Sequence, residues 1–124
     1  MKIKLGKKII TNKSPTYFVA DIAANHDGNL KRAIKLIKLA KDSGADAVKF
    51  QMVVNDELCT PDYIHYELFK SLQMEDEVWV RIVKQIHSSG KKVYFDIFGR
   101  DSLSIAKALN ADGVKIHLSD FYNK

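Results

Sequence analysis

The sequence predicts an α/β chain of parallel (β/α) units that form the first half of a (β/α)8 barrel, preceded by a small β-hairpin. Apolar runs of strand length alternate with segments of helical period, an order typical of a parallel sheet with right-handed crossovers. Each expected strand has one apolar face and one face with polar residues near its carboxyl end. A motif that ends a helix and opens a strand occurs twice, at 43–51 and at 110–116. Together these patterns favour a barrel unit.

Length and composition indicate one soluble globular domain over residues 1–124. The chain is 46% hydrophobic and 28% charged and has no Gly/Ser linker, whereas a complete barrel needs ~250 residues. The net charge of +5 is too small to indicate nucleic acid. The single Cys59 excludes an internal disulfide and fits a reducing compartment. With no signal peptide and no membrane-length apolar run, we expect a cytoplasmic protein without a membrane partner.

The first elements follow from turn residues and helix caps. Residues 2–10 predict a hairpin around Gly6, and residues 17–23 predict the first parallel strand. Asn29 is the expected N-cap of a helix that ends before Gly44. A strand that carries Lys49 and Gln51 follows.

The remaining elements are predicted from the same signals. Thr60 and Pro61 resemble an N-cap and a first helical residue. The elements expected after the Lys49 strand are a short helix at 62–71, a helix at 76–88, a strand at 92–98, a helix capped by Asp101 or Ser102, and a strand at 113–118. We expect helices to cover one face of each strand, with Phe18 in the first covered set and Val114, Ile116 and Leu118 in the last.

The opposite faces of the strands distinguish a barrel from an open doubly wound sheet. They carry polar residues toward the strand ends, namely Asp21, Lys49, Gln51, Asp96, Lys115 and His117. Helices cover both faces of an open sheet, so polar residues in its strands would be buried, and the sequence has no glycine-rich nucleotide motif. We therefore favour the barrel. Four strands leave two unpaired edges, so either the chain is an N-terminal piece of a longer protein or copies associate as a homo-oligomer through these edges.

Two lysines at strand ends suit a small anion such as a phosphate or a carboxylate. Asp21 could donate or accept a proton or orient a hydroxyl group. A Schiff-base lysine is the competing enzymatic interpretation, but nearby carboxylates keep a lysine charged and favour anion binding. Lys49 or Lys115 could instead form a purely structural ion pair with Asp21 or Asp96, and Asp96 fits a structural role better than a catalytic one.

Two further features concern loops and metals. Asn25 and His26 follow the first parallel strand, in a loop that would border the barrel mouth. No spacing of His, Cys, Asp and Glu in the sequence forms a complete metal site.

Two motifs indicate a family. Residues 18–28 read Phe-Val-Ala-Asp-Ile-Ala-Ala-Asn-His-Asp-Gly, and residues 44–51 read Gly-Ala-Asp-Ala-Val-Lys-Phe-Gln. They resemble the N-acetylneuraminate (sialic acid) synthase family, whose pattern is Ala-Glu-Ile-Gly-x-Asn-His-x-Gly followed by Gly-Ala-Asp-x-x-Lys-x-Gln. The resemblance extends from Phe18 to Asn123.

The resemblance implies a fold, a reaction and roles for residues. Members of the family are TIM barrels that condense phosphoenolpyruvate with N-acetylmannosamine or a related sugar, using a divalent metal ion (Mn or Mg). By position, Lys49 and Lys115 would hold phosphoenolpyruvate, and Gln51 would lie near the sugar or the metal. Asp21 would replace a glutamate placed for proton transfer or sugar contact, and Asp120 would replace a second, sugar-binding glutamate. Other expected substrate contacts are Asn25, His26, Arg100, His117 and Ser119.

The chain also departs from the family pattern. Ile-Phe-Gly-Arg-Asp at 97–101 replaces Ser-Thr-Pro-Phe-Asp, so Arg100 would stand in for a phosphate-binding threonine. The family's Lys-Ile-x-Ser-Gly-Glu is Lys-Ile-His-Leu-Ser-Asp at 115–120, so the serine is either moved to Ser119 or lost. The metal-binding histidines of the family lie on later strands, so the metal is expected only of a full-length enzyme. The sequence therefore predicts part of a sialic-acid-like (nonulosonic acid) synthase that is inactive alone. The alternative is a non-catalytic half-barrel that binds phosphorylated ligands or self-associates.

Overall fold

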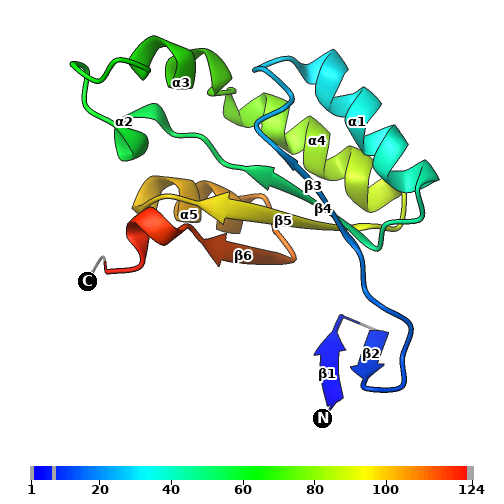
Figure 1. The fold of residues 1–124 in the computed structure, drawn as a ribbon. Helices are drawn as coiled ribbons and strands as arrows, with labels where there is room; N and C mark the ends of the chain where they lie inside the picture. Colours follow the sequence, from blue (N-terminus) through cyan, green and yellow to red (C-terminus); the bar gives the residue numbers. More distant parts are fainter. Residues whose placement is uncertain (1, 7, 123–124) are drawn as a thin grey trace.

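The computed structural model describes residues 2–6 and 8–122. An antiparallel hairpin of β1 (Lys2–Leu5) and β2 (Lys8–Thr11) forms its own sheet, separate from a four-stranded parallel sheet (Figure 1). The strands of this sheet lie in the order β3 (Val19–Ala23), β4 (Ala47–Gln51), β5 (Lys92–Ile97) and β6 (Gly113–Ile116). The predicted fold class, parallel (β/α) units after a small hairpin, is confirmed.

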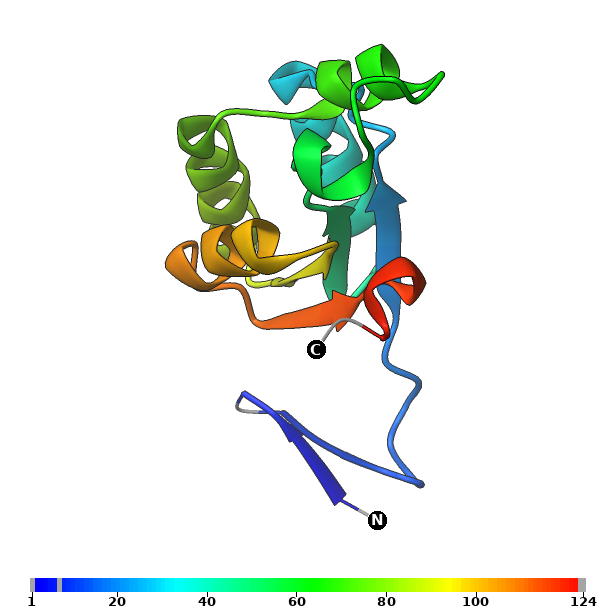
Figure 2. The ribbon, with the colours of Figure 1, turned by 90° about the vertical axis from the view of Figure 1, so that its left-hand side faces the viewer.

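Three long helices connect the parallel strands. They are α1 (Leu30–Asp42), α4 (Asp76–Ser88) and α5 (Arg100–Ala108). In the turned view, α4 and α5 lie on the same side of the sheet (Figure 2). Asn29 caps α1 as predicted, since its side-chain oxygen accepts a hydrogen bond from the backbone N–H of Arg32 at 3.1 Å. The predicted helix at 76–88 is also confirmed.

The core lies between the helices and the face of the sheet that they cover. Phe50 of β4 and Phe95 of β5 are completely buried there against Trp79 of α4. Both phenylalanine rings meet the indole edge-on, with centroid distances of 5.8 and 5.3 Å. Such edge-to-face contacts add to the stabilisation that burial of the rings provides.

The covered face ends at β5. Val114 and Ile116 of β6 point to the same side as Phe95 and Ile97, yet 43% and 60% of their surfaces are exposed. Phe18, Leu118 and the adjacent Phe121 are exposed as well. The expectation that helices cover Phe18 and the apolar side of the last strand is therefore wrong for the described residues.

The connection after β4 differs from the prediction. It forms a one-turn helix, α2 (Asn55–Leu58), and then α3 (Tyr66–Leu72), whereas the sequence predicted one helix at 62–71. The Thr60 hydroxyl donates to the Asp62 carboxylate at 2.6 Å instead of capping a helix. A short-range hydrogen bond of this kind stabilises a turn in competition with a helix start.

The start of α5 and the ends of two strands also differ. Gly99, rather than Asp101 or Ser102, is the N-cap of α5. The Glu57 carboxylate, from the β4–α3 connection, accepts hydrogen bonds from the backbone N–H groups of Asp101 and Ser102 at 2.6 and 3.1 Å. β5 ends at Ile97 and β6 at Ile116, and a 3-10 turn, η1 (Leu118–Asp120), follows.

At the amino ends of the strands, the two copies of the repeated motif place equivalent aspartates. Asp46, before β4, accepts a hydrogen bond from the Phe18 N–H at 2.9 Å. Asp112, before β6, accepts one from the Val93 N–H at 3.0 Å. Each aspartate thus fixes the start of the preceding strand in the sheet. Among residues 2–6 and 8–122, no helix is long and apolar enough to cross a membrane.

Candidate functional site

The face of the sheet that the helices leave uncovered carries a row of alternating charges. From β3 to β6 these are Asp21, Lys49, Asp96 and Lys115. In the strand register, Asp21 lies opposite Lys49, and Asp96 lies opposite Lys115. Gln51 is two residues beyond Lys49 on the same face, opposite Asp96. The predicted convergence of these side chains on one face is therefore seen in the structure.

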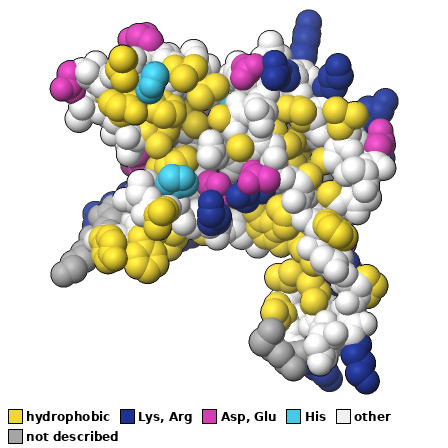
Figure 3. All heavy atoms as spheres, in the orientation of Figure 1, with side chains coloured by type: hydrophobic (Ala, Val, Ile, Leu, Met, Phe, Trp, Pro, Cys, Tyr) yellow, Lys and Arg dark blue, Asp and Glu magenta, His cyan; other side chains and the backbone are white. Residues whose placement is uncertain are grey.

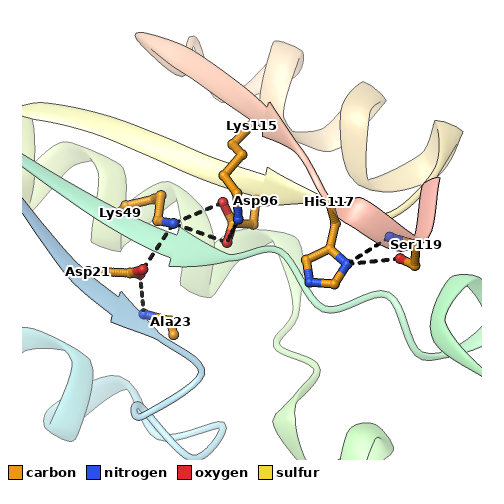
Figure 4. A network of polar contacts seen from close by, with 7 residues as sticks. All are labelled: Asp21, Ala23, Lys49, Asp96, Lys115, His117 and Ser119. Carbon is orange, nitrogen blue, oxygen red and sulfur yellow. Dashed lines mark hydrogen bonds and ion pairs between the residues drawn. The ribbon is translucent and has the colours of Figure 1, made fainter. Parts of the chain in front are cut away.

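The four charged side chains form one continuous network (Figure 4). Lys49 Nζ lies 3.0 Å from Asp21 Oδ2 and 3.1 Å from Asp96 Oδ1. Lys115 Nζ lies 3.1 Å from Asp96 Oδ2. Asp96 is thus held between the two lysines, while Lys49 is held between the two aspartates. Figure 3 shows acidic and basic side chains meeting in the middle of this face.

The protonation of Lys49 follows from its surroundings. Burial of the side chain favours the neutral amine, but hydrogen bonds and charge interactions with Asp21 and Asp96 outweigh burial and raise the pKa of Lys49 above its ordinary value. The amine is consequently an ammonium ion at neutral pH. In this state it can bind an anion but cannot attack a carbonyl group.

A backbone irregularity orients Asp21. The β3–β4 register shifts between Asp21 and Ala23, and Ala23 has a positive φ of 52°. The Asp21 Oδ1 atom accepts a hydrogen bond from the Ala23 N–H at 3.1 Å across this bulge. Bulges often aim side chains at functional sites, and here the second carboxylate oxygen remains directed at Lys49.

Beside the network the uncovered face is hollowed. The hollow has a volume of about 400 Å³, and its lining includes Asp21, Lys49 and Lys115 together with Tyr94 and Gly113. A Cβ atom at Gly113 would come within 2.9 Å of the Tyr94 ring. The second copy of the motif therefore has glycine where the first has Ala47, because Tyr94 occupies the adjacent space.

His117 and Ser119 lie at the end of β6 and contact each other. The Ser119 N–H lies 3.3 Å from His117 Nδ1, and the Ser119 hydroxyl lies 2.9 Å from the same atom (Figure 4). The imidazole also packs against Phe98 at a centroid distance of 4.8 Å. These contacts stabilise η1, which also contains the half-buried Asp120.

His26 lies in the core, apart from the charged network. Its side chain is completely buried against Phe50 and Trp79, and Nδ1 accepts a hydrogen bond from the Gly28 N–H at 3.1 Å. Burial lowers the pKa of His26, which favours the neutral ring. In this structure His26 fixes the β3–α1 loop and has no surface for a substrate.

Two other predicted site residues are also outside the network. The neighbouring Asn25 is exposed, and its side chain donates to the Ile22 carbonyl at 2.9 Å. Arg100, the first residue of α5, is exposed.

Asp96 pairs with both Lys49 and Lys115, in agreement with the structural role that the sequence favoured for it. It lies within β5, directly opposite Lys115 of β6. Sequence reasoning missed Glu57 entirely, and no local pattern could have revealed it because its contacts with α5 span 44 and 45 residues.

The described residues do not fit a metal ion. Within 2–6 and 8–122, no group of three or more His, Cys, Asp or Glu side chains is arranged to hold one. In the network, each carboxylate is directed at a lysine ammonium group, which competes with a cation for the same oxygens.

The chain has curated relatives among sugar-acid synthases, although no family model matches it. It is 29% identical to a pseudaminic acid synthase of Campylobacter jejuni, over 81% of this chain and 33% of that protein. It is 28% identical to an N,N'-diacetyllegionaminic acid synthase of Legionella pneumophila, over 86% of this chain and 34% of that protein. An uncharacterized protein of Methanocaldococcus jannaschii is 29% identical over 96% of this chain and 35% of its own length. The chain thus spans about a third of the length of these relatives.

Two solved structures share the fold. A sialic acid synthetase of Leptospira borgpetersenii superimposes with a TM-score of 0.87 at 23% identity, over 97% of this chain and 42% of that one. A spore coat polysaccharide biosynthesis protein of Bacillus subtilis gives a TM-score of 0.74 at 26% identity, over 94% of this chain and 33% of that one. The resemblance to the N-acetylneuraminate synthase family is therefore confirmed.

Proposed function

We propose that this chain, a relative of the sialic acid synthases, forms the anion-binding floor of a nonulosonic acid synthase. The reaction would condense phosphoenolpyruvate with N-acetylmannosamine or a related amino sugar. The observation that carries the proposal is the convergence of Lys49 and Lys115 on one carboxylate beside a hollow of about 400 Å³. Ligand pockets commonly have volumes of about 300–1,000 Å³.

The chemistry of phosphoenolpyruvate matches two ammonium groups on neighbouring strands. The molecule has a carboxylate and a phosphate, and each can accept charge-assisted hydrogen bonds. Lys115 is the more accessible lysine, so it would make the first contact. Lys49 could contact the anion only if the anion competes with Asp21, because the Lys49 ammonium group already contacts both aspartates.

Asp21 would then become free to act on the second substrate. A carboxylate released from Lys49 can accept a proton or orient a sugar hydroxyl group. Asp96 would remain between the lysines and keep both ammonium groups in place. Because the described residues do not fit a metal ion, no step is assigned to one.

Titration with phosphoenolpyruvate tests the proposal. We expect Lys115→Ala to weaken binding about tenfold or more, since it removes a charge-assisted contact. Lys38→Ala is the matched control, because Lys38 lies exposed on α1, away from the network. Calorimetry on the three proteins gives the affinities. Equal dissociation constants for the wild type and Lys115→Ala would contradict the proposal.

The state of Lys49 separates anion binding from Schiff-base chemistry. Because its raised pKa keeps the amine protonated, incubation with pyruvate and borohydride should leave the mass of the protein unchanged. Mass spectrometry of the intact chain and of its peptides measures the result. A reduced adduct on Lys49 would contradict the anion-binding role of this lysine and support covalent catalysis.

A further inference from the structure

Glu57 joins two connections that follow neighbouring strands at the carboxyl edge of the parallel sheet. It belongs to α2, which follows β4, and its carboxylate contacts the start of α5, which follows β5 (Figure 1). Both oxygens are used, since Oε1 accepts from the Asp101 N–H at 2.6 Å and Oε2 accepts from the Ser102 N–H at 3.1 Å. The free N–H groups and the dipole of a helix N-terminus both favour a negative charge there. These hydrogen bonds are therefore charge-assisted and stronger than those between neutral groups.

The contact explains why position 99 is a glycine. The φ of Gly99 is −176°, an extended backbone that any residue can adopt, so the conformation does not require glycine. A Cβ atom at this position would come within 2.6 Å of the Glu57 carboxyl carbon, which is closer than real Cβ contacts. Glycine leaves the space that the Glu57 carboxylate occupies. The turn before α5 is thus adapted to the side chain of a distant residue.

The turn between β5 and α5 has two supports. The completely buried Ser102 supports it from within α5, because its Oγ atom accepts hydrogen bonds from the N–H groups of Phe98 and Gly99 at 3.0 and 3.1 Å. Glu57 supports it from the connection after β4. The first support moves together with α5, whereas the second ties the start of α5 to a different part of the chain.

The same turn determines where His117 lies. Phe98, directly after β5, is buried, and its ring packs against the His117 imidazole at a centroid distance of 4.8 Å. The His117 N–H donates to the Ile97 carbonyl at 3.1 Å. His117 is in turn joined to Ser119 of η1 (Figure 4). A shift of the turn would therefore shift His117 and η1 as well.

We infer that Glu57 is a positioning residue of the candidate site. It fixes the turn between β5 and α5, and through Phe98 it sets the position of the His117 imidazole at the end of the uncovered face. Glu57 acts through these residues and not by contact with a substrate. The inference rests on the proposed function only in taking His117 as part of the substrate side.

Hydrogen exchange tests whether Glu57 fixes the turn. In Glu57→Ala, the amides of Asp101 and Ser102 should exchange about tenfold faster or more, because both charge-assisted hydrogen bonds are lost. Gly99→Ala should accelerate the same amides, since its Cβ atom displaces the Glu57 carboxylate. Asp101→Ala is the matched control. It removes an exposed carboxylate from the same helix start but keeps the N–H that donates to Glu57, so the exchange of Ser102 should stay within about twofold. Unchanged exchange in Glu57→Ala and Gly99→Ala would overturn the inference.

The contact between the Phe98 and His117 rings separates positioning from simple capping of α5. Nuclear Overhauser spectra of the wild type and of Asp101→Ala should show this contact. It should be largely lost in Glu57→Ala and Gly99→Ala, with circular dichroism showing folded protein. Faster exchange with an unchanged ring contact would mean that Glu57 only caps α5, and would overturn the inference.

Glu57→Gln provides a milder variant. It keeps one side-chain oxygen as an acceptor, so the ring contact should be weaker than in the wild type and stronger than in Gly99→Ala. If Glu57→Ala does not fold, Gly99→Ala and Glu57→Gln give the same comparison. Neither measurement uses a ligand, so a failed phosphoenolpyruvate titration would leave the result for Glu57 unchanged.

Discussion

Aspartate and lysine meet in two regions of this molecule, at the amino ends of the strands and on the uncovered face, with different consequences. At the amino end, Asp112 accepts hydrogen bonds from the Val93 N–H at 3.0 Å and from Lys92 Nζ at 2.6 Å. On the uncovered face, the described hydrogen bonds of the Asp96 carboxylate all come from lysine side chains. The first arrangement fixes the backbone of the sheet, whereas the second holds two ammonium groups beside a hollow.

The comparison divides the repeated motif into two parts. Its aspartates, Asp46 and Asp112, lie at the amino end and fasten neighbouring strands. Its lysines, Lys49 and Lys115, come three residues later and point to the uncovered face. One short motif therefore supplies both a structural bond and a member of the candidate site, which explains why aspartate and lysine recur together.

The largest expected effect is that of Asp96→Ala. The substitution leaves Lys115 without its described carboxylate partner and leaves the largely buried Lys49 with Asp21 alone. We expect a loss of about 3 kcal/mol in the free energy of unfolding, because removing one member of a buried pair leaves a charge uncompensated. Urea denaturation measures it. Asp42→Asn, on the surface of α1, should cost about 0.5 kcal/mol or less. A similar small loss for Asp96→Ala would mean that the network contributes little to stability.

Asp112→Ala should have a smaller effect that depends on pH. Burial disfavours the charged form, but hydrogen bonds from Lys92, the Val93 N–H and His87 outweigh burial and hold the pKa of Asp112 below its ordinary value. A lowered folded-state pKa stabilises the protein above the unfolded value of about 3.9, and this stability is lost as the pH falls through the folded-state pKa.

At pH 6 we therefore expect Asp112→Ala to lower the free energy of unfolding by about 2 kcal/mol. The difference from the wild type should shrink as the pH falls below about 4. Urea denaturation at a series of pH values gives both curves. A difference that stays constant down to acidic pH would show that the contribution of Asp112 does not depend on its charge.

The sequence predicted the parallel architecture well because periodicity and caps are local signals. Asn29 as the cap of α1 and the limits of α4 depend on residues within one or two helical turns. The start of α5 could not be predicted in this way, since the backbone N–H groups of Asp101 and Ser102 in its first turn donate to Glu57 from a distant connection. The exposure of Val114 and Ile116, on the side of β6 that helices were expected to cover, was also missed. Alternation in a strand shows which residues share a face but not what covers that face.

For the candidate site, the sequence predicted which face the residues occupy but not how they are connected. Alternation placed Lys49 and Lys115 on the uncovered face, and the structure agrees. The position of Asp96 between the two lysines depends on the register of β4 and β5. In this register Asp96 lies opposite Gln51, two residues beyond Lys49. His26 shows the opposite case, since its position in a strand-to-helix loop suggested the barrel mouth while its ring packs inward against Trp79.

The smallest expected effect is that of Lys92→Met at the amino end. The Lys92 side chain is 40% exposed, so its ion pair with Asp112 is screened by water and should contribute about 0.5 kcal/mol. A double-mutant cycle of Lys92→Met with Asp112→Ala isolates this coupling from the backbone hydrogen bond to Val93. The same cycle for Lys49→Met with Asp96→Ala should give a coupling at least about three times larger, because those side chains are largely buried. Added salt should reduce the first coupling and leave the second nearly unchanged. Equal couplings with equal salt dependence would remove the distinction between the two regions, and the ion pairs of the candidate site would then be no stronger than those of the surface.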